Sequence, residues 1–338
     1  MSITLTTTWY PRGELERFAR YLPKLEELYA HLVICLIPEG DASIHEQFTS
    51  GKYASDPQII FRLNEQRCNG RYLALKAALE APGDYIHYVD MDRLLHWVET
   101  RPEEWQQIVE LIPEADCSIF GRTEAATRTH PQALITTEML SNRVVSHFLD
   151  TEMDVSAGSK AFCRAAAQYL VAHGSSDNSI GTDAEWPILL KKAGFHLQYI
   201  LVDGLDYESA DQFMLRAATG AEQREAAALY DKDATHWSAR VAIADQIIKS
   251  ALEVSQMIYP TVTSGKSSTE EFDFAAVFDV DDYLYFYGEM LTDERTDTEV
   301  RALVGMLELD NPKRILDLAC GFGRHSNRLA ALGHTITG

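Results

Sequence analysis

The sequence predicts an α/β protein built on a doubly wound, mostly parallel sheet. Two observations lead to this class. Short apolar or β-branched runs alternate with longer segments of helical spacing along most of the 338 residues, a rhythm typical of βα units. Several of these runs, such as HLVICLIPE at 31–39, are almost continuously apolar, as expected of strands that are buried on both faces.

The expected elements begin at the amino terminus. ITLTTT at 3–8 is short and β-branched, which indicates a strand, and the amphipathic helix after it is expected to kink at Pro23. Further strands are expected at 31–39, 58–65, 84–93, 116–123 and 196–209. Helices are expected at 69–81, 102–114, 131–149, 159–173 and over most of 221–258.

Charge and cysteine content exclude several classes of function. The chain has 51 Asp and Glu against 30 Lys and Arg, a formal charge of −21, so it should repel phosphate backbones, and nucleic acid is not an expected partner. The five cysteines are widely spaced, which favours free thiols in a reducing cytoplasm over a disulfide framework. No signal peptide and no apolar run long enough for a transmembrane segment is seen.

One polar segment divides the chain. TVTSGKSSTEE at 261–271 has no apolar period and indicates a linker. We therefore expect a domain over 1–258, a linker over 259–275 and a second segment over 276–338. In that segment a helix over 296–309 should lead into the strand RILDLA, a glycine-containing loop and another helix.

Two carboxylates follow the expected strand DYIHYVDMDR. Asp90 and Asp92 are separated by one residue, and ligands of doubly wound sheets bind at the carboxyl ends of the strands. Such a pair can hold Mg²⁺ or Mn²⁺, which takes the rest of its shell from water and substrate phosphates. A solvated acidic loop after a strand is the alternative explanation of the same pattern.

The stretch NGRYLALKAALEAPGDYIHYVDMDR resembles nucleotide-sugar glycosyltransferases of the GT-A fold, of the family 2 type, and the resemblance covers roughly residues 1 to 215. It implies a GT-A-like sheet and a site for a nucleotide-sugar donor. Asp90 and Asp92 would hold the metal and the donor diphosphate. Thr7 would border the nucleotide, Glu39 would contact the base or ribose, and Arg71 would face the donor phosphates.

A second stretch, SIGTDAEWPILLKKAGFHLQYI, resembles the part of these enzymes that carries the catalytic base. The resemblance implies that Asp183 removes the proton of an acceptor hydroxyl. N-capping of the helix that follows is the alternative role. Family members often have Glu-Asp where this chain has Thr182-Asp183, which leaves inversion or retention open. Gly158, in VSAGSKAF, matches a small-residue turn that permits close backbone approach.

The stretch ILDLACGFGR resembles the first motif of class I S-adenosylmethionine-dependent methyltransferases. In such a motif Asp317 would organise the loop near the methionine amino group, and Gly321 and Gly323 would line the cofactor. The sequence given stops before the acidic residue that grips the ribose in that family. We therefore expect an incomplete, Rossmann-like methyltransferase segment that transfers no methyl group as it stands, with S-adenosylmethionine a cofactor of a longer form only.

These expectations define a hypothesis and its competitors. The hypothesis is metal-dependent transfer of a sugar from a nucleotide-sugar donor to the hydroxyl of a glycan or small-molecule acceptor, within a bifunctional glycosyltransferase and methyltransferase. One alternative is a methyltransferase whose amino-terminal region recruits its substrate. Another is a nucleotidyltransferase, and a third is a binding module without catalysis.

Overall fold

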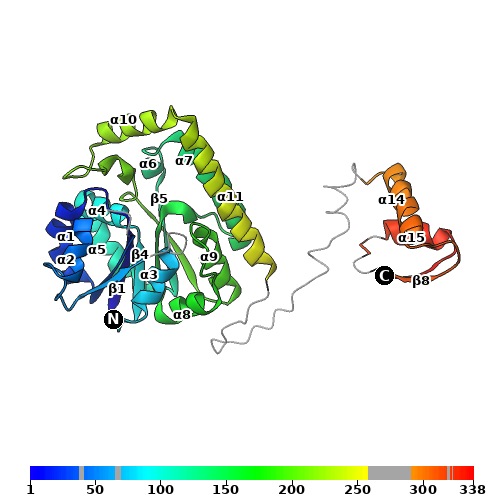
Figure 1. Cartoon of the computed structure of the whole chain (residues 1–338), viewed down its shortest axis with the longest axis horizontal. Coiled ribbons are helices and arrows are strands. Elements are labelled where there is room, and N and C mark those ends of the chain that lie inside the picture. Colours follow the sequence, from blue (N-terminus) through cyan, green and yellow to red (C-terminus); the bar gives the residue numbers. More distant parts are fainter. Residues whose placement is uncertain (38–41, 65–69, 258–290, 318–319, 322) are drawn as a thin grey trace. The chain divides into compact units, whose positions relative to one another are not determined.

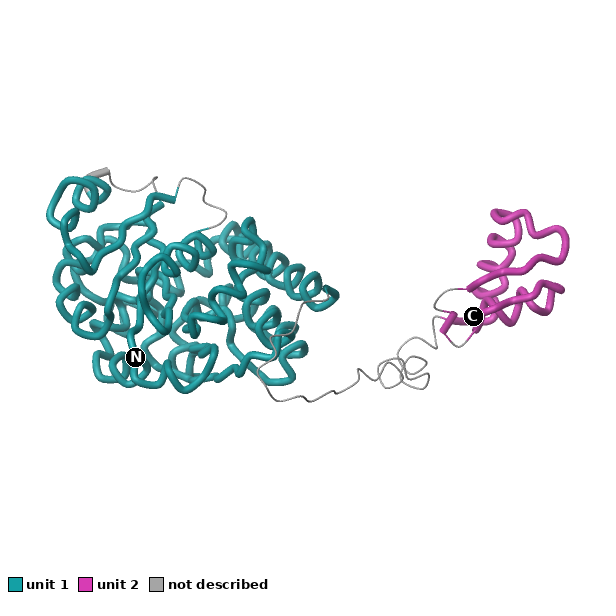
Figure 2. Tube along the Cα trace, turned by 90° about the horizontal axis from the view of Figure 1, so that it is seen from below, with its two compact units in different colours: residues 1–265 teal, residues 266–338 magenta. Residues whose placement is uncertain are grey.

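The computed structural model describes residues 1–37, 42–64, 70–257, 291–317, 320–321 and 323–338. The chain forms two compact units, Met1–Gly265 and Lys266–Gly338, coloured separately in Figure 2. The predicted linker over 259–275 lies outside the described residues. None of the helices in the described ranges combines the length and apolar content that crossing a bilayer requires.

The first unit is built on a seven-stranded mixed sheet in the order β3-β2-β1-β4-β6-β5-β7. The strands are β1 (Ile3–Trp9), β2 (His31–Leu36), β3 (Ile59–Leu63), β4 (Tyr85–Val89), β5 (Cys117–Arg122), β6 (Ser159–Cys163) and β7 (Leu197–Val202). Every neighbouring pair is parallel except the two pairs that β6 forms. The carboxyl ends of six strands and the amino end of β6 therefore lie together at one end of the sheet.

Helices cover both faces of this sheet (Figure 1), as a doubly wound sheet requires. They are α1 (Leu15–Leu28), α2 (Ala42–Thr49), α3 (Gly70–Ala78), α4 (Met91–Thr100), α5 (Pro102–Leu111), α6 (Glu124–Thr127), α7 (Gln132–Leu149), α8 (Arg164–His173), α9 (Thr182–Lys192), α10 (Gly220–Asp231) and α11 (Ala234–Gln256), with short 3-10 turns η2 (Ile112–Glu114), η3 (Val155–Ala157) and η4 (Glu208–Asp211). Apolar side chains of α1, α4 and α5 share one core, and those of α3, α8 and α9 share the other. The helix α11 packs along α7 and α9.

Strand β2 shows why the sequence folds in this way. Leu32, Ile34 and Leu36 face the core with α1, whereas Val33 and Cys35 face the core with α3. All five are buried, so a strand with two apolar faces is satisfied only between two helical layers. The predicted α/β class and the mostly parallel sheet are therefore confirmed.

Three predicted boundaries differ clearly from the structure. The strand predicted at 196–209 ends at Val202, because the N–H groups of Asp203 and Gly204 donate to Glu104, and the last two residues of the predicted range belong to η4. The strand predicted at 84–93 ends at Val89, and α4 begins at Met91, because Asp90 has extended backbone at the N-cap position and Asp92 places a carboxylate in the first helical turn. The helix predicted at 159–173 is divided into β6 and α8. Pairing of β6 with both β4 and β5 outweighs the helical spacing of its small side chains.

The second unit contains α14 (Asp293–Met306), β8 (Arg314–Leu316), α15 (Arg324–Ala331) and β9 (Thr335–Thr337). Strands β8 and β9 pair in parallel, and the described order of strand, loop, helix and strand is the predicted one. Val300, Leu309 and Leu329 form its small core.

Candidate active site

The site lies where the strand order of the sheet reverses. Strand β2 flanks β1 on one side and β4 flanks it on the other, so the position between the carboxyl ends of β1 and β4 is a topological switch point, where ligands of open α/β sheets bind. The Thr8 hydroxyl oxygen lies 2.9 Å from the Tyr88 hydroxyl oxygen, and the Thr8 hydroxyl donates to Asp90 Oδ1 at 3.4 Å. The predicted residue Thr7 is buried beside it, and its hydroxyl donates to the Thr8 carbonyl at 3.3 Å.

Asp90 is paired on both carboxylate oxygens. Oδ1 accepts from the Tyr88 hydroxyl and from Thr8, while Oδ2 accepts from Arg71 at 3.1 Å and from Arg93 at 3.5 Å. Burial opposes ionisation of Asp90, but the two guanidinium groups outweigh burial and hold its pKa below the ordinary value. Asp90 is therefore an ionised carboxylate fixed by its neighbours.

Arg71 joins the two predicted acidic positions. Its Nη2 donates to Asp90, and its Nη1 donates to Asp183 Oδ1 at 2.7 Å. Lys160 Nζ, from β6, donates to the same Asp183 oxygen at 2.7 Å and to the Val155 carbonyl at 2.8 Å. Against the effect of burial, Arg71 and Lys160 lower the pKa of Asp183. The structure thus brings together Asp90, which directly follows β4, Asp183 of α9 and Arg71 of α3.

Arg93 links this group to a further acid and depends on a glycine. Its Nε donates to Glu208 Oε1 at 3.4 Å and its Nη1 to the Ser156 carbonyl at 3.5 Å. Gly158 has φ +75°, and a Cβ there would lie 1.6 Å from Arg93 Nη1 and 2.8 Å from Asp90 Oδ2. The backbone at Gly158 therefore lies close to a side chain of the site, as its positive φ allows, while an approach of this turn to an acceptor or sugar stays a prediction.

Asp92 is less well compensated than Asp90. Its Oδ1 accepts from the Arg93 backbone N–H at 2.9 Å, and its Oδ2 lies 3.9 Å from Arg12 Nη1. Burial, together with the charges of Glu208 and Asp90, raises the pKa of Asp92 to about 7. Within the described ranges no protein group donates to the buried Oε2 of Glu208. This side of the site therefore has an excess of acceptor oxygens.

The cluster has two halves with different pairing. The paired half, in which each carboxylate is held by two cations, consists of Arg71, Asp90, Lys160 and Asp183. The open half, in which the contacts are long or lacking, consists of Arg12, Asp92, Arg93 and Glu208. Each half contains two acidic and two basic side chains, and Arg93 connects the halves through its contact with Asp90.

A divalent cation fits the open half of this cluster. In the described part of the chain no three acidic, His or Cys side chains come together as a complete metal site, but Mg²⁺ bound with a substrate diphosphate needs only one or two protein carboxylates. The mutual repulsion of Asp92, Glu208 and Asp90 is a feature that a cation offsets. Asp92 is the better candidate for a carboxylate that coordinates the cation, since Asp90 already accepts from two guanidinium groups.

Four residues of this cluster escaped the sequence analysis, namely Arg12, Arg93, Lys160 and Glu208. Lys160 carried a signal, since it is the one charged residue in the small-residue stretch VSAGSKAF. The predicted donor residue Glu39 lies outside the described residues. Asp317 lies in the second unit, where its carboxylate accepts from the Ser326 hydroxyl.

The loop that follows β8 contains the other two predicted cofactor residues. Gly321 and Gly323 adopt positive φ of +55° and +78°, which suits glycine. Their roles toward a cofactor stay predictions.

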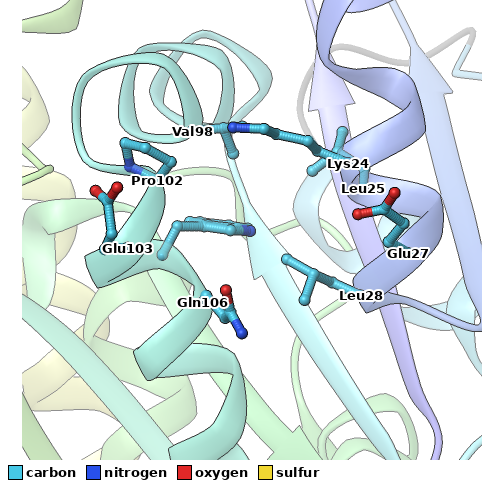
Figure 3. Close-up of a pocket in the computed structure, with 9 residues that line it drawn as sticks. Lys24, Leu25, Glu27, Leu28, Val98, Pro102, Glu103 and Gln106 are labelled. Atoms are coloured by element: carbon cyan, nitrogen blue, oxygen red, sulfur yellow. The ribbon is translucent and has the colours of Figure 1, made fainter.

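Two hollows share no lining residue with the cluster. A groove of about 970 Å³ follows one side of α7 and has Arg122 and Asp154 in its lining, with Met139 and Leu201 as its exposed apolar side chains. Its size is that of ordinary ligand pockets. A smaller pocket of about 210 Å³ lies between α1 and α5 (Figure 3) and presents Lys24, among other residues, but no part of the cluster.

Comparisons with known proteins give similarity of structure only. No protein-family model matches the sequence, and no curated protein matches it. The chain is similar to glucosyl-3-phosphoglycerate synthase from Mycobacterium tuberculosis, solved with UDP, at 13% identity and a TM-score of 0.43 over 80% of this chain and 84% of that chain.

The chain is also similar to two further solved structures. One is a mannosyltransferase from Pyrobaculum calidifontis in complex with GDP-Man and Mn²⁺, at 12% identity and a TM-score of 0.33 over 75% of this chain and 76% of that chain. The other is 4-diphosphocytidyl-2C-methyl-D-erythritol synthase from Anaerococcus prevotii, at 11% identity and a TM-score of 0.39 over 68% and 97%. Similarities this distant assign no activity, so function has to be argued from the side chains of the site.

Proposed function

We propose that residues 1–265 transfer a sugar from a nucleotide-sugar donor to an acceptor hydroxyl, on a sheet of the GT-A type. One observation carries the proposal. The Arg71 guanidinium joins Asp90 to Asp183 at the switch point of the sheet, next to the underpaired Asp92. Fixed cations beside an underpaired carboxylate suit a ligand that combines a diphosphate with a polar sugar.

The donor lies between the carboxyl ends of β1 and β4 in this proposal. Thr7, in β1, and Glu39, three residues after β2 in the sequence, border its nucleoside, and Arg71 faces its phosphates. Asp92, assisted by Asp90, holds Mg²⁺ or Mn²⁺, which when bound neutralises the diphosphate as it leaves. Arg12 and Arg93 flank the same carboxylate and add positive charge for the donor phosphates.

In the reaction, the acceptor oxygen forms a bond to the anomeric carbon while the bond from that carbon to the diphosphate oxygen breaks. The nucleoside diphosphate leaves with the bonding electrons, and the acceptor hydroxyl loses its proton. The resemblance to family 2 enzymes assigns proton removal to Asp183. The groove beside α7 is the candidate entry for the acceptor, since Asp154 in its lining directly precedes the η3 turn, whose Val155 carbonyl accepts from Lys160.

Nucleotidyl transfer is a second candidate, because Arg12, in the loop after β1, lies near Asp92. In that reaction a sugar phosphate attacks a nucleoside triphosphate and pyrophosphate leaves. Product analysis separates the two activities. Sugar transfer releases nucleoside diphosphate from a nucleotide sugar, whereas nucleotidyl transfer releases pyrophosphate from a nucleoside triphosphate.

For the second unit we propose the cofactor loop of a class I methyltransferase. Support comes from the strand–loop–helix order and from the positive φ of Gly321 and Gly323. Calorimetric titration of a longer form of the protein with S-adenosylmethionine tests this. We expect wild type to bind the cofactor and Asp317→Ala to lose the heat of binding. If wild type in that form does not bind the cofactor, the bifunctional hypothesis is wrong.

The proposed sugar transfer is tested first by binding. Nucleoside diphosphates and their sugars are titrated by calorimetry, with and without Mn²⁺, into the wild type, Asp92→Asn and the control Asp245→Asn. Asp245 pairs with Lys249 at an exposed position on α11. We expect metal-dependent binding of one nucleotide that Asp92→Asn weakens at least tenfold and that the control preserves. Equal affinity in all three proteins would overturn the placement of the donor.

A further inference from the structure

Asp183 lies in a buried ion-pair relay rather than at an open surface. We propose that Asp183 and Lys160 are positioning residues that hold Arg71 against the donor site, and that the acceptor's proton passes to a phosphate oxygen of the leaving nucleoside diphosphate and not to Asp183. This inference rests on the proposed function and gives a different role to a residue that the sequence assigned as the base.

The first argument is access. Asp183 is 2% exposed and Lys160 is 3% exposed. A general base must come within about 2.6–3.2 Å of the hydroxyl that it deprotonates. The oxygen Oδ1 of Asp183 is already held at 2.7 Å by both Arg71 and Lys160. An acceptor hydroxyl would have to displace a buried cation to reach this oxygen, and with the side chain only 3% exposed the other oxygen, Oδ2, offers little surface to an acceptor either.

The second argument is the geometry of Arg71. Its two terminal nitrogens are divided between Asp183 and Asp90, at 2.7 Å and 3.1 Å. Since a guanidinium is planar and rigid, fixing Nη1 on Asp183 also fixes the direction of Nη2. The contact with Asp183 is the shorter of the two. We therefore infer that Asp183 fixes the position of the guanidinium, while Nη2 is directed toward Asp90 and the donor phosphates.

The charges of the paired half balance. Arg71, Lys160, Asp90 and Asp183 form a neutral set of two cations and two anions. Lys160 is held by the Val155 carbonyl, so it cannot leave when Asp183 is neutralised. Asp183→Asn then leaves two cations facing one anion, and Arg71 turns toward Asp90. Lys160→Met leaves the opposite imbalance, and the two changes together restore neutrality.

The experiment is a double-substitution cycle with Asp183→Asn, Lys160→Met and the combined variant. Nucleotide affinity is measured by calorimetry and sugar transfer by steady-state kinetics across pH. We expect each single change to alter donor affinity about tenfold, and the combined variant to return within about threefold of wild type in both affinity and kcat. Asp245→Asn with Lys249→Met, an exposed pair on α11, is the matched control and should show no coupling.

A base role gives a different pattern. Asp183→Asn would then keep wild-type donor affinity, lose kcat at least a hundredfold and lose the acidic limb of the pH profile, and Lys160→Met would restore nothing. That result would overturn the inference.

Thermal unfolding of the same variants keeps the inference testable if wild type binds no nucleotide, in which case the proposed function fails on its own. A melting temperature of the combined variant above that of either single variant is the expected result. A combined variant less stable than both single variants would contradict the neutral relay. If Asp183→Asn does not fold, the folded combined variant and Lys160→Met still give the comparison of affinity and kcat.

Discussion

Asp90 and Asp92 are separated by one residue, yet they differ in almost every electrostatic respect. Asp90 accepts four side-chain hydrogen bonds and keeps a pKa below the ordinary value, whereas Asp92 faces two other acids and has a pKa of about 7. The difference lies in the cations within reach and not in burial alone. The paired half of the cluster is thus built for fixed geometry, and the open half for a ligand that brings positive charge.

The largest expected effect comes from breaking the paired half. Arg71→Met removes the cation between Asp90 and Asp183 and leaves buried carboxylates without their main partner, which should cost about 3–5 kcal/mol of unfolding free energy. Urea unfolding measures this. Arg62→Met is the control, because Arg62 forms an exposed pair with Glu80 that is worth about 0–1 kcal/mol. Similar losses in both variants would contradict the paired half as a stabilising unit.

The first unit also contains a buried histidine that is held between two carboxylates, as Arg71 is in the paired half. His96 is held at 2.7 Å by both Asp206 and Asp211. Burial opposes its charge, but these two hydrogen bonds raise its pKa to about 10. Since the folded pKa lies above the unfolded value, this stabilisation is complete below about pH 6.5 and is lost as pH rises through about 10.

We therefore expect wild type to exceed His96→Gln by about 2–4 kcal/mol in unfolding free energy at pH 6, and the gap to shrink by pH 10. Denaturant titrations at the two pH values give the result. A gap that is independent of pH would mean that His96 acts through packing and not through its charge.

Gly158→Ala tests the junction between the halves. An alanine Cβ would overlap Arg93 Nη1 at 1.6 Å, and φ +75° is strained for alanine, so we expect a loss of about 2 kcal/mol together with weaker donor binding. Gly333→Ala, in the second unit, is the control, because it shares a positive φ but meets no atom within 4 Å. Only the Gly158 variant should affect nucleotide affinity in calorimetry.

The smallest effect has the opposite sign. Asp92 has a folded pKa of about 7, above its unfolded value near 4, so its ionisation destabilises the fold as pH rises through about 7. Asp92→Asn should therefore raise stability at pH 8 by about 1–2 kcal/mol, a figure reduced for partial exposure of the side chain, and should have little effect at pH 4. Thermal unfolding at both pH values checks this, and a loss of stability at pH 8 would show that Asp92 is compensated after all.

The sequence alone predicted the class of the fold because apolar periodicity is local. It also identified Asp90, Asp183 and Arg71, which the structure brings together. It could not predict that Arg71 spans the two acids, since Asp183 lies 112 residues away and ion pairing depends on tertiary structure. Strand β6 was missed for the same reason, because its small side chains suit a helix until β4 and β5 supply hydrogen-bond partners.

The reversed strand also has a consequence for the order of folding. Strands β4 and β5 are not neighbours, and β6 joins them. While the chain is being synthesised, β1 to β4 can pair as a four-stranded block once residue 89 has emerged, but β5 has to wait, since both of its partners, β6 and β7, are made later. The two parts of the sheet are therefore expected to close late, around a strand of five residues that also delivers Lys160 to Asp183.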